Sequence, residues 1–331
     1  MANEAEIINN PDSTPGAVST GYQLQNTNLV SQRTGIDKTY VSGGAGTITV
    51  EISGPVDVNG VLYDIKSQTI LTPPSAGRYY ITLQGAGPQY LTPTLSSVTA
   101  GYIYWSALKN AYYTVGDEYR VLDWLVDFDG TDCRVYRRGE CYLEDWITSN
   151  TSIILPWSQV YKFDLGGKGG DGGAGFPERG GGGGGGAGAW GFTNKFLDAG
   201  TELTIVFSSS SGGNTTISEG ASLYFAIQNG YDGSAGGYST GGAGGAPGAT
   251  STGLIFTHSG YRVGTAGTSG TPGIGGFGGN SFCVLKEING ESSHGRPSAS
   301  GYGAGGDGGS GVVGTTAGST GSGGFVKITY I

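Results

Sequence analysis

The chain has 331 residues, of which 68 are glycine and only 13% are charged, and its net charge at pH 7 is −9. This acidic balance, with no basic run longer than Arg137-Arg138, argues against nucleic acid as a partner. No stretch approaches the roughly 18–20 apolar residues that span a bilayer, and the first residues lack the basic and apolar regions of a secretory signal. We therefore expect neither membrane insertion nor a signal peptide.

Glycine is distributed unevenly, and its distribution divides the chain. Residues 1–160 contain 15 glycines and the remaining residues contain 53. Such a step in composition indicates a module boundary, which we place within Pro156–Tyr161. We expect a polar N-terminal arm over residues 1–35, a β-rich module over 36–159 and a glycine-rich domain over 160–331.

The stretch from Thr39 to Ile147 has the pattern of an all-β sandwich or barrel, with short alternating runs between turn residues. Asn59-Gly60 separates two apolar runs, which predicts a β-hairpin. We expect three tryptophans to fill the core of this module, and almost no α-helix, since Ala107–Tyr113 alone favours a helical turn. The three tryptophans are Trp105, Trp124 and Trp146.

An acidic cluster in this module has two interpretations. Asp123, Asp127, Asp129 and Asp132 are spaced like half of a calcium loop, although no glutamate follows at the matching distance. The favoured alternative is a hairpin that turns at Asp129-Gly130 and exposes the other carboxylates to solvent. We therefore predict no metal site.

The cysteines do not indicate a metal site or a cofactor. Cys133 and Cys141 flank RVYRRGE, which favours a hairpin that turns near Arg138-Gly139 and brings the two thiols opposite each other. They are either reduced or joined in one cross-strand disulfide, since no further metal ligands stand at suitable spacing. Cys283 has no partner by sequence.

The glycine-rich domain repeats glycine at every third position, which is the period of the polyproline-II backbone and not of an α-helix or β-strand. We predict polyglycine-II helices that hydrogen-bond to one another, interleaved with β-strands. The final residues, Phe325–Ile331, predict a strand with a face to bury, because Phe325, Lys327, Thr329 and Ile331 alternate with Val326, Ile328 and Tyr330. The clearest runs are Gly264 to Gly279, Gly305 to Gly314, Gly318 to Gly324 and the doubled glycines of 166–173.

The order of strands and glycine runs over residues 160–331, ending in FVKITYI, resembles the glycine-rich domain of bacteriophage tail-fibre adhesins, especially the distal adhesins of T-even-type phages. A related fold occurs in receptor kinases of the anaplastic lymphoma kinase type, and residues 78–129 are more weakly similar to β-modules of phage tail proteins. The resemblance implies a rigid bundle whose loops bind a polysaccharide or an outer-membrane protein on the host cell. It also implies location on the virion, at the tail or capsid surface, and attachment to other virion proteins through the N-terminal module, with a homotrimer as the first expectation.

Two stretches poor in glycine interrupt the three-residue glycine repeat, at residues 253–264 and 280–300. Aromatic and arginine side chains on loops of a rigid scaffold are typical of a recognition surface, and the alternative is that these residues plug the end of the bundle. The candidate receptor-binding residues are Phe256, His258, Tyr261, Arg262, Phe282, Lys286 and Arg296.

The sequence does not indicate an enzyme. Its histidines, His258 and His294, have no suitable cysteine as a partner. Matches to G-x-S-x-G, such as Gly237–Gly241, and to G-x-G-x-x-G carry no weight in so glycine-rich a chain. The one catalytic alternative that we retain is a glycosidase-like pair of carboxylates brought close together by the fold. Two non-enzymatic alternatives to an adhesin are a purely structural virion component, such as a capsid spike or fibre shaft, and an ice-binding protein.

Overall fold

A computed structural model describes residues 39–58, 61–84, 92–139, 143–176, 180–237, 240–249, 251–256, 305 and 317–330. All regular elements there are β-strands in antiparallel sheets, so the prediction of an all-β chain with almost no helix is confirmed for this part. No helix that could cross a membrane occurs in it. The strands are β1 (Thr39–Gly43), β2 (Ile48–Val58), β3 (Val61–Leu71), β4 (Gly77–Gln84), β5 (Thr92–Ser97), β6 (Ile103–Ser106), β7 (Ala111–Thr114), β8 (Arg120–Phe128), β9 (Cys133–Arg137), β10 (Glu144–Ile147), β11 (Thr151–Ile154), β12 (Gln159–Gly166), β13 (Trp190–Leu197), β14 (Glu202–Phe207), β15 (Asn214–Glu219), β16 (Ser222–Gln228), β17 (Ser251–Thr252), β18 (Ile255–Phe256) and β19 (Phe325–Tyr330).

The chain divides into two compact units. The first takes its described residues from Met1–Cys141, together with Pro156–Ser158 and Asp198–Thr201, and the second contains Tyr142–Leu155, Gln159–Leu197 and Glu202–Ile331. Strands β1–β9 therefore belong to the first unit and β10–β19 to the second.

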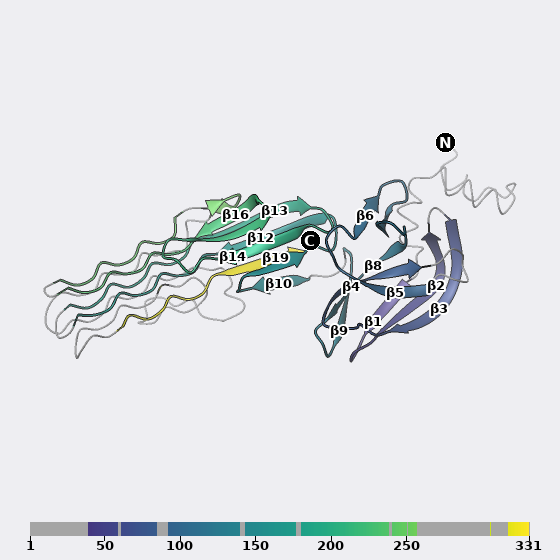
Figure 1. Ribbon diagram of the computed structural model, residues 1–331, viewed down its shortest axis with the longest axis horizontal. Helices are drawn as coiled ribbons and strands as arrows, with labels where there is room; N and C mark the ends of the chain where they lie inside the picture. Colours follow the sequence, from purple (N-terminus) through teal and green to yellow (C-terminus); the bar gives the residue numbers. More distant parts are fainter. Residues whose placement is uncertain are drawn as a thin grey trace, which may run out of the picture. The chain divides into compact units, whose positions relative to one another are not determined.

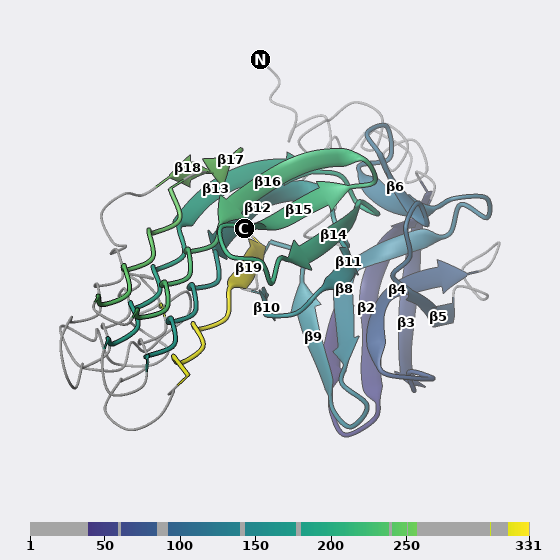
Figure 2. The same ribbon diagram turned by 60° about the vertical axis from the view of Figure 1, so that its left-hand side comes forward.

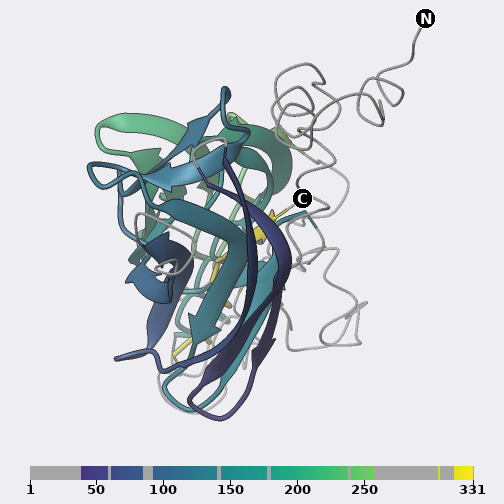
Figure 3. The same ribbon diagram turned by 90° about the vertical axis from the view of Figure 1, so that its right-hand side faces the viewer.

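In the first unit, a three-stranded sheet, β1-β2-β3, packs on a larger sheet of order β5-β4-β8-β7-β6, with β9 paired to β8. Figure 3 shows the long β2–β3 hairpin in purple beside the larger sheet. Val58 and Val61 lie opposite each other in this hairpin, as the Asn-Gly signal predicts. The shared core contains Val41, Ile48, Val50 and Ile52 from the small sheet and Tyr79, Ile81, Leu83, Leu122, Val126 and Cys133 from the large one.

Two of the three tryptophans predicted to fill the core of the first module do not. Trp105 is 37% exposed, because its strand β6 lies at the edge of the larger sheet. Trp146 lies on β10 in the second unit, where its ring centroid is 5.7 Å from that of Phe325. Trp124 packs against the core as predicted, and Trp157 is the buried tryptophan of the first unit.

The helical turn predicted at Ala107–Tyr113 is also wrong. A turn ends at Asn110, which has a φ of 47°, and the chain continues as β7. β7 pairs with both β6 and β8, and Tyr112 and Tyr113 are buried. Two-sided strand pairing with large buried rings outweighs the weak local helix preference.

The second unit contains two five-stranded sheets, of order β10-β19-β12-β13-β18 and β11-β14-β15-β16-β17. At both edges of the pair the chain crosses from one sheet to the other. β10 is followed by β11 at one edge, and β17 is followed by β18 at the other. Phe163 of β12 meets Phe225 of β16 between the sheets, with ring centroids 4.9 Å apart. Val326, Ile328 and Tyr330 are buried, as one face of the alternating closing strand, whereas Phe325 of the other face is buried as well.

Five glycine-rich stretches, called the first to fifth glycine segments, run from the ends of these strands side by side (Figures 1 and 2). The first follows β12, the second leads into β13, the third follows β16, the fourth precedes β17 and the fifth leads into β19. In order they comprise residues 167–176, 180–189, 229–237, 240–249 and 317–324.

Candidate functional site

Backbone hydrogen bonds join the first and second glycine segments at every third residue. Gly166 lies opposite Trp190 at the end of the β12–β13 pair, and the next bond joins Gly167 to Ala189, so the register of the strands continues into the segments. The bonds run from Gly167 N to Ala189 O, from Gly170 N to Gly186 O and from Gly173 N to Gly183 O, each at 2.8 Å.

Each of the first three segments bonds to more than one neighbour. The third segment donates to the first in a parallel arrangement, as from Gly230 N to Lys168 O at 2.8 Å. It also accepts from the second segment and donates to the fourth, as from Tyr231 N to Ala246 O at 2.9 Å. Because successive N–H groups point in different directions around the segment axis, the bonds extend in two dimensions across the group, unlike those of a sheet.

Close backbone approach, and not an unusual dihedral angle, accounts for the glycines. A Cβ atom built on Gly182, Gly185 or Gly188 would lie 1.9–2.1 Å from a carbonyl oxygen of the first segment. Real side chains do not reach such distances, so the segments would have to separate. Among the glycines that the structure describes in these segments, none has a positive φ.

The second segment occupies the centre of the group. Residues 180–189 are all buried, and they contact the first, third and fourth segments and also Gly305. A segment surrounded in this way has no direction in which a large side chain fits, which explains the run of consecutive glycines over 180–186. Its remaining positions are Ala187, Gly188 and Ala189.

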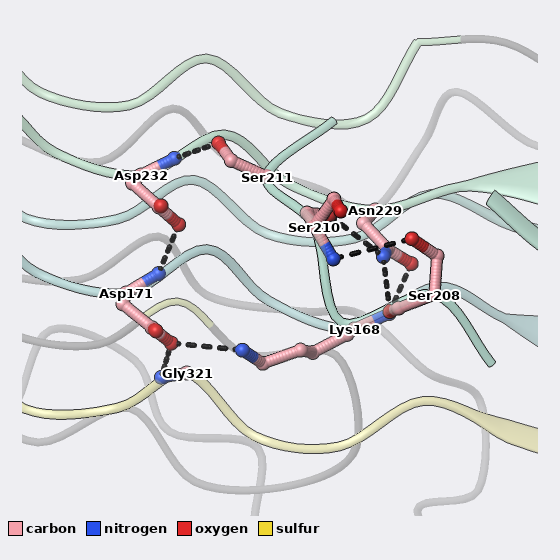
Figure 4. Close-up of polar contacts among 8 residues, drawn as sticks. All are labelled: Lys168, Asp171, Ser208, Ser210, Ser211, Asn229, Asp232 and Gly321. Atoms are coloured by element: carbon pink, nitrogen blue, oxygen red, sulfur yellow. Dashed lines mark hydrogen bonds and ion pairs between the residues drawn. The ribbon is translucent and has the colours of Figure 1, made fainter. Parts of the chain in front are cut away.

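The outer segments carry polar side chains that hydrogen-bond to backbone amides of their neighbours (Figure 4). The Oδ1 atom of Asp171 accepts from the backbone N–H of Gly321 at 2.8 Å and from Nζ of Lys168 at 3.1 Å. The Oδ1 atom of Asp232 accepts from the backbone N–H of Asp171 at 2.8 Å. The first segment is thus joined by side chains to the third and to the fifth.

Asn229 joins the base of the third segment to the first segment and to the 208–211 loop. Its side chain is buried, with 1% exposed, and its Oδ1 atom accepts from the backbone N–H of Lys168 at 2.9 Å. Its Nδ2 atom donates to the carbonyl oxygens of Ser208 and Ser210 at 2.9 and 3.2 Å. Sequence reasoning missed this polar network, although the three-residue spacing of Lys168 to Asp171 and of Asn229 to Asp232 hints at it.

The predicted receptor-binding residues fall largely outside the part of the chain that the structure describes. The backbone of Phe256 lies in β18, opposite Gly191 of β13, so the 253–264 stretch begins at the sheet end of the glycine segments. The side chain of Phe256 lies outside the described part, as do His258, Tyr261, Arg262, Phe282, Lys286 and Arg296.

The acidic cluster of the first unit forms the predicted hairpin. Phe128 lies opposite Cys133, and Gly130 in the turn has a φ of +101°. The other carboxylates are not simply solvated: Asp123 pairs with Arg138 at 2.9 Å and Asp127 with Arg78 at 3.9 Å. Within the described residues, no three histidine, cysteine, aspartate or glutamate side chains gather as metal ligands.

Cys133 is a free, buried thiol, and burial raises its pKa, with Asp129 and Asp132 adding to the effect. Its strand β9 pairs with β8. Cys141 and Cys283 lie outside the described residues, so the predicted hairpin that would bring the thiols of Cys133 and Cys141 together stays a prediction.

No protein-family model matches the chain, and no curated protein is significantly similar to it. Its function must therefore be inferred from its own residues and geometry.

Proposed function

We propose that the protein is a virion tail-fibre or adhesin protein that recognises a receptor on a bacterial surface. In this proposal the glycine segments are polyglycine-II helices, and their bundle presents the receptor-binding loops. The observation that carries the proposal is the three-residue period of hydrogen bonds between the segments. A flexible glycine linker needs no such bonds.

The hydrogen-bonding pattern between the glycine segments favours a rigid base for the loops. Glycine loses more conformational entropy on ordering than any other residue, so a group of glycine segments is stable only as a cooperative unit. The continuous register from β12 and β13 into the first two segments fixes their position on a packed pair of sheets. Loops on such a base lose little entropy when they bind a partner.

Receptor contact is assigned to the stretches 253–264 and 280–300, through their aromatic and arginine side chains. Arginine offers a planar group for carboxylates or phosphates, and tyrosine offers an amphipathic ring for sugars or protein loops. The first unit is assigned to attachment to other virion proteins. The main alternative is a structural virion component that binds no receptor.

Adsorption of the purified full-length chain to a panel of bacterial strains tests the proposal. We expect saturable adsorption to the host, and its loss when Tyr261 and Arg262 are both replaced by alanine while the melting temperature is unchanged. Alanine replacement of the neighbours Tyr136 and Arg137, which lie in the first unit, is the matched control. Adsorption to none of the strains would favour a structural component, and thermal hysteresis would indicate ice binding.

A further inference from the structure

The β6–β7 hairpin of the first unit carries an exposed aromatic side chain that the fold does not require there. Trp105 is 37% exposed, although its cross-strand partner Tyr112 is 1% exposed. The two rings meet edge to face, with centroids 4.9 Å apart. The buried ring of Tyr112 thus contacts one side of the indole, and part of Trp105 remains exposed to solvent.

A charged pair lies beside this ring. The guanidinium carbon of Arg138 is 5.4 Å from the ring centroid of Trp105 and 5.5 Å from that of Tyr112. Its Nε atom donates to Oδ1 of Asp123 at 2.9 Å, and the two backbones are also bonded, from Arg138 N to Asp123 O at 3.0 Å. Both side chains are partly exposed, at 28% and 21%.

The pair retains hydrogen-bonding capacity. In the part of the chain that the structure describes, the Nε atom of Arg138 is committed to Asp123, and no further partner occurs for the two terminal nitrogens or for Oδ2 of Asp123. Donors and acceptors therefore stand next to an indole ring. The arrangement is held in place by ring packing and by backbone bonds, so binding would order few side chains.

The hairpin itself is fixed by its turns. Asn110 and Glu118 are the two non-glycine residues with positive φ in the described chain; Asn110 ends the β6–β7 turn and Glu118 lies in the β7–β8 turn. Such strained residues concentrate at functional sites. Tyr104 lies on the opposite face of the same hairpin, where its hydroxyl donates to Glu118 at 3.4 Å.

We infer that Trp105, Arg138 and Asp123 form a binding site for a neutral oligosaccharide. A pyranose ring presents C–H groups that pack on the electron-rich face of an indole, and its hydroxyls suit the paired donors and acceptors of a guanidinium and a carboxylate. The charges of Arg138 and Asp123 compensate each other, so the site has no net preference for an anion. This inference is independent of the proposed receptor loops of the second unit.

The test uses the full-length chain and neutral hexasaccharides of glucose, mannose, galactose and N-acetylglucosamine, with oligogalacturonate as the acidic comparison. We expect one neutral hexasaccharide to give saturable calorimetric binding and to change the tryptophan fluorescence. Trp105→Ala should weaken this binding about tenfold or more, Trp105→Phe should weaken it less, and Arg138→Lys and Asp123→Asn should each weaken it.

Tyr104→Ala is the matched control, because it removes a similarly exposed ring from the other face of the hairpin, and it should leave saccharide binding unchanged. Circular dichroism and the melting temperature establish that each variant is folded. The inference is overturned if no neutral hexasaccharide binds at about 10 mM, if only the acidic oligosaccharide binds, or if Trp105→Ala and Tyr104→Ala bind equally well. Trp105→Ala should still adsorb to the host, because the proposed receptor loops lie in the second unit.

Discussion

Gly185 lies so close to Gly170 that a Cβ atom on Gly185 would be 2.0 Å from the carbonyl oxygen of Gly170. The same relationship recurs three residues away on both sides, at Gly182 with Gly173 and at Gly188 with Gly167. The separation between segments is therefore set by contacts in which glycine Cα atoms touch carbonyl groups. A single methyl group must either distort this contact or push two segments apart.

We predict that Gly185→Ala destabilises the protein by about 3 kcal/mol or more, because the added methyl overpacks a site bounded by backbone that has no rotamer to change. Gly323→Ala is the matched control, since its Cβ would meet nothing within 4 Å. That change should be neutral or stabilise by up to about 1 kcal/mol. Urea unfolding of both variants measures the difference, and equal stabilities would contradict close packing as the reason for glycine.

The polar network gives a second prediction. Asn229→Ala removes partners from the backbone N–H of Lys168 and from the carbonyl oxygens of Ser208 and Ser210. Each buried polar group left unpaired costs about 1–3 kcal/mol, so we expect a total loss of about 3 kcal/mol or more. Asn194→Ala, at an exposed position, should stay within about 0.5 kcal/mol of the parent. A small effect of Asn229→Ala in denaturant unfolding would mean that water replaces the side chain.

Local sequence signals predicted the elements formed by neighbouring residues. The hairpin at Asn59-Gly60, the turn at Asp129-Gly130 and the buried face of Phe325–Ile331 depend on short-range geometry, which a sequence displays directly. The three-residue glycine period similarly anticipates the spacing of the bonds between Gly170 and Gly186 and their equivalents.

Features that depend on distant residues were not predictable in this way. Trp146 was assigned to the first module because it precedes residue 160, yet β10 pairs with β19, near the other end of the chain. Trp105 looks like a core residue until the sheet order places β6 at an edge. The amide that Asn229 satisfies belongs to Lys168, 61 residues away, and no local pattern reveals such a partner.

A third prediction concerns pH. The backbone N–H groups of Asp132 and Thr131 donate to Asp129 and lower its pKa, with a smaller contribution from Arg134. A lowered pKa in the folded state means that Asp129 stabilises the protein above the unfolded pKa of about 4. This contribution is lost as the pH falls through the lower, folded value.

Asp129→Asn keeps an oxygen acceptor in the turn and removes the titration. Its unfolding free energy should therefore depend less on pH between about pH 5 and pH 2 than that of the parent. Carboxyl carbon NMR of the parent should give a titration midpoint for Asp129 below its ordinary value. A midpoint at or above that value would show that the two backbone bonds do not persist in solution.

The last prediction follows from the closure of the second unit by β10 and β11. Trp146 and Glu144 of β10 contact the closing strand, where Nζ of Lys327 lies 2.7 Å from a carboxylate oxygen of Glu144 and the indole packs on Phe325. β11 covers the edge strand β14 through pairs such as Ile153 with Leu203. A fragment that begins at residue 160 lacks both strands and exposes two unpaired sheet edges, which are prone to pair with other chains.

We therefore expect a fragment of residues 142–331 to be monodisperse and to unfold cooperatively, whereas the 160–331 fragment should melt at a lower temperature and aggregate. Light scattering and thermal unfolding of the two fragments at equal concentration measure this. The fragments share all the glycine segments, so any difference reports on residues 142–159, which contain β10 and β11. Equal melting temperatures and equal particle sizes would show that the glycine segments and the remaining eight strands are stable without them, and adsorption assays could then use the shorter fragment.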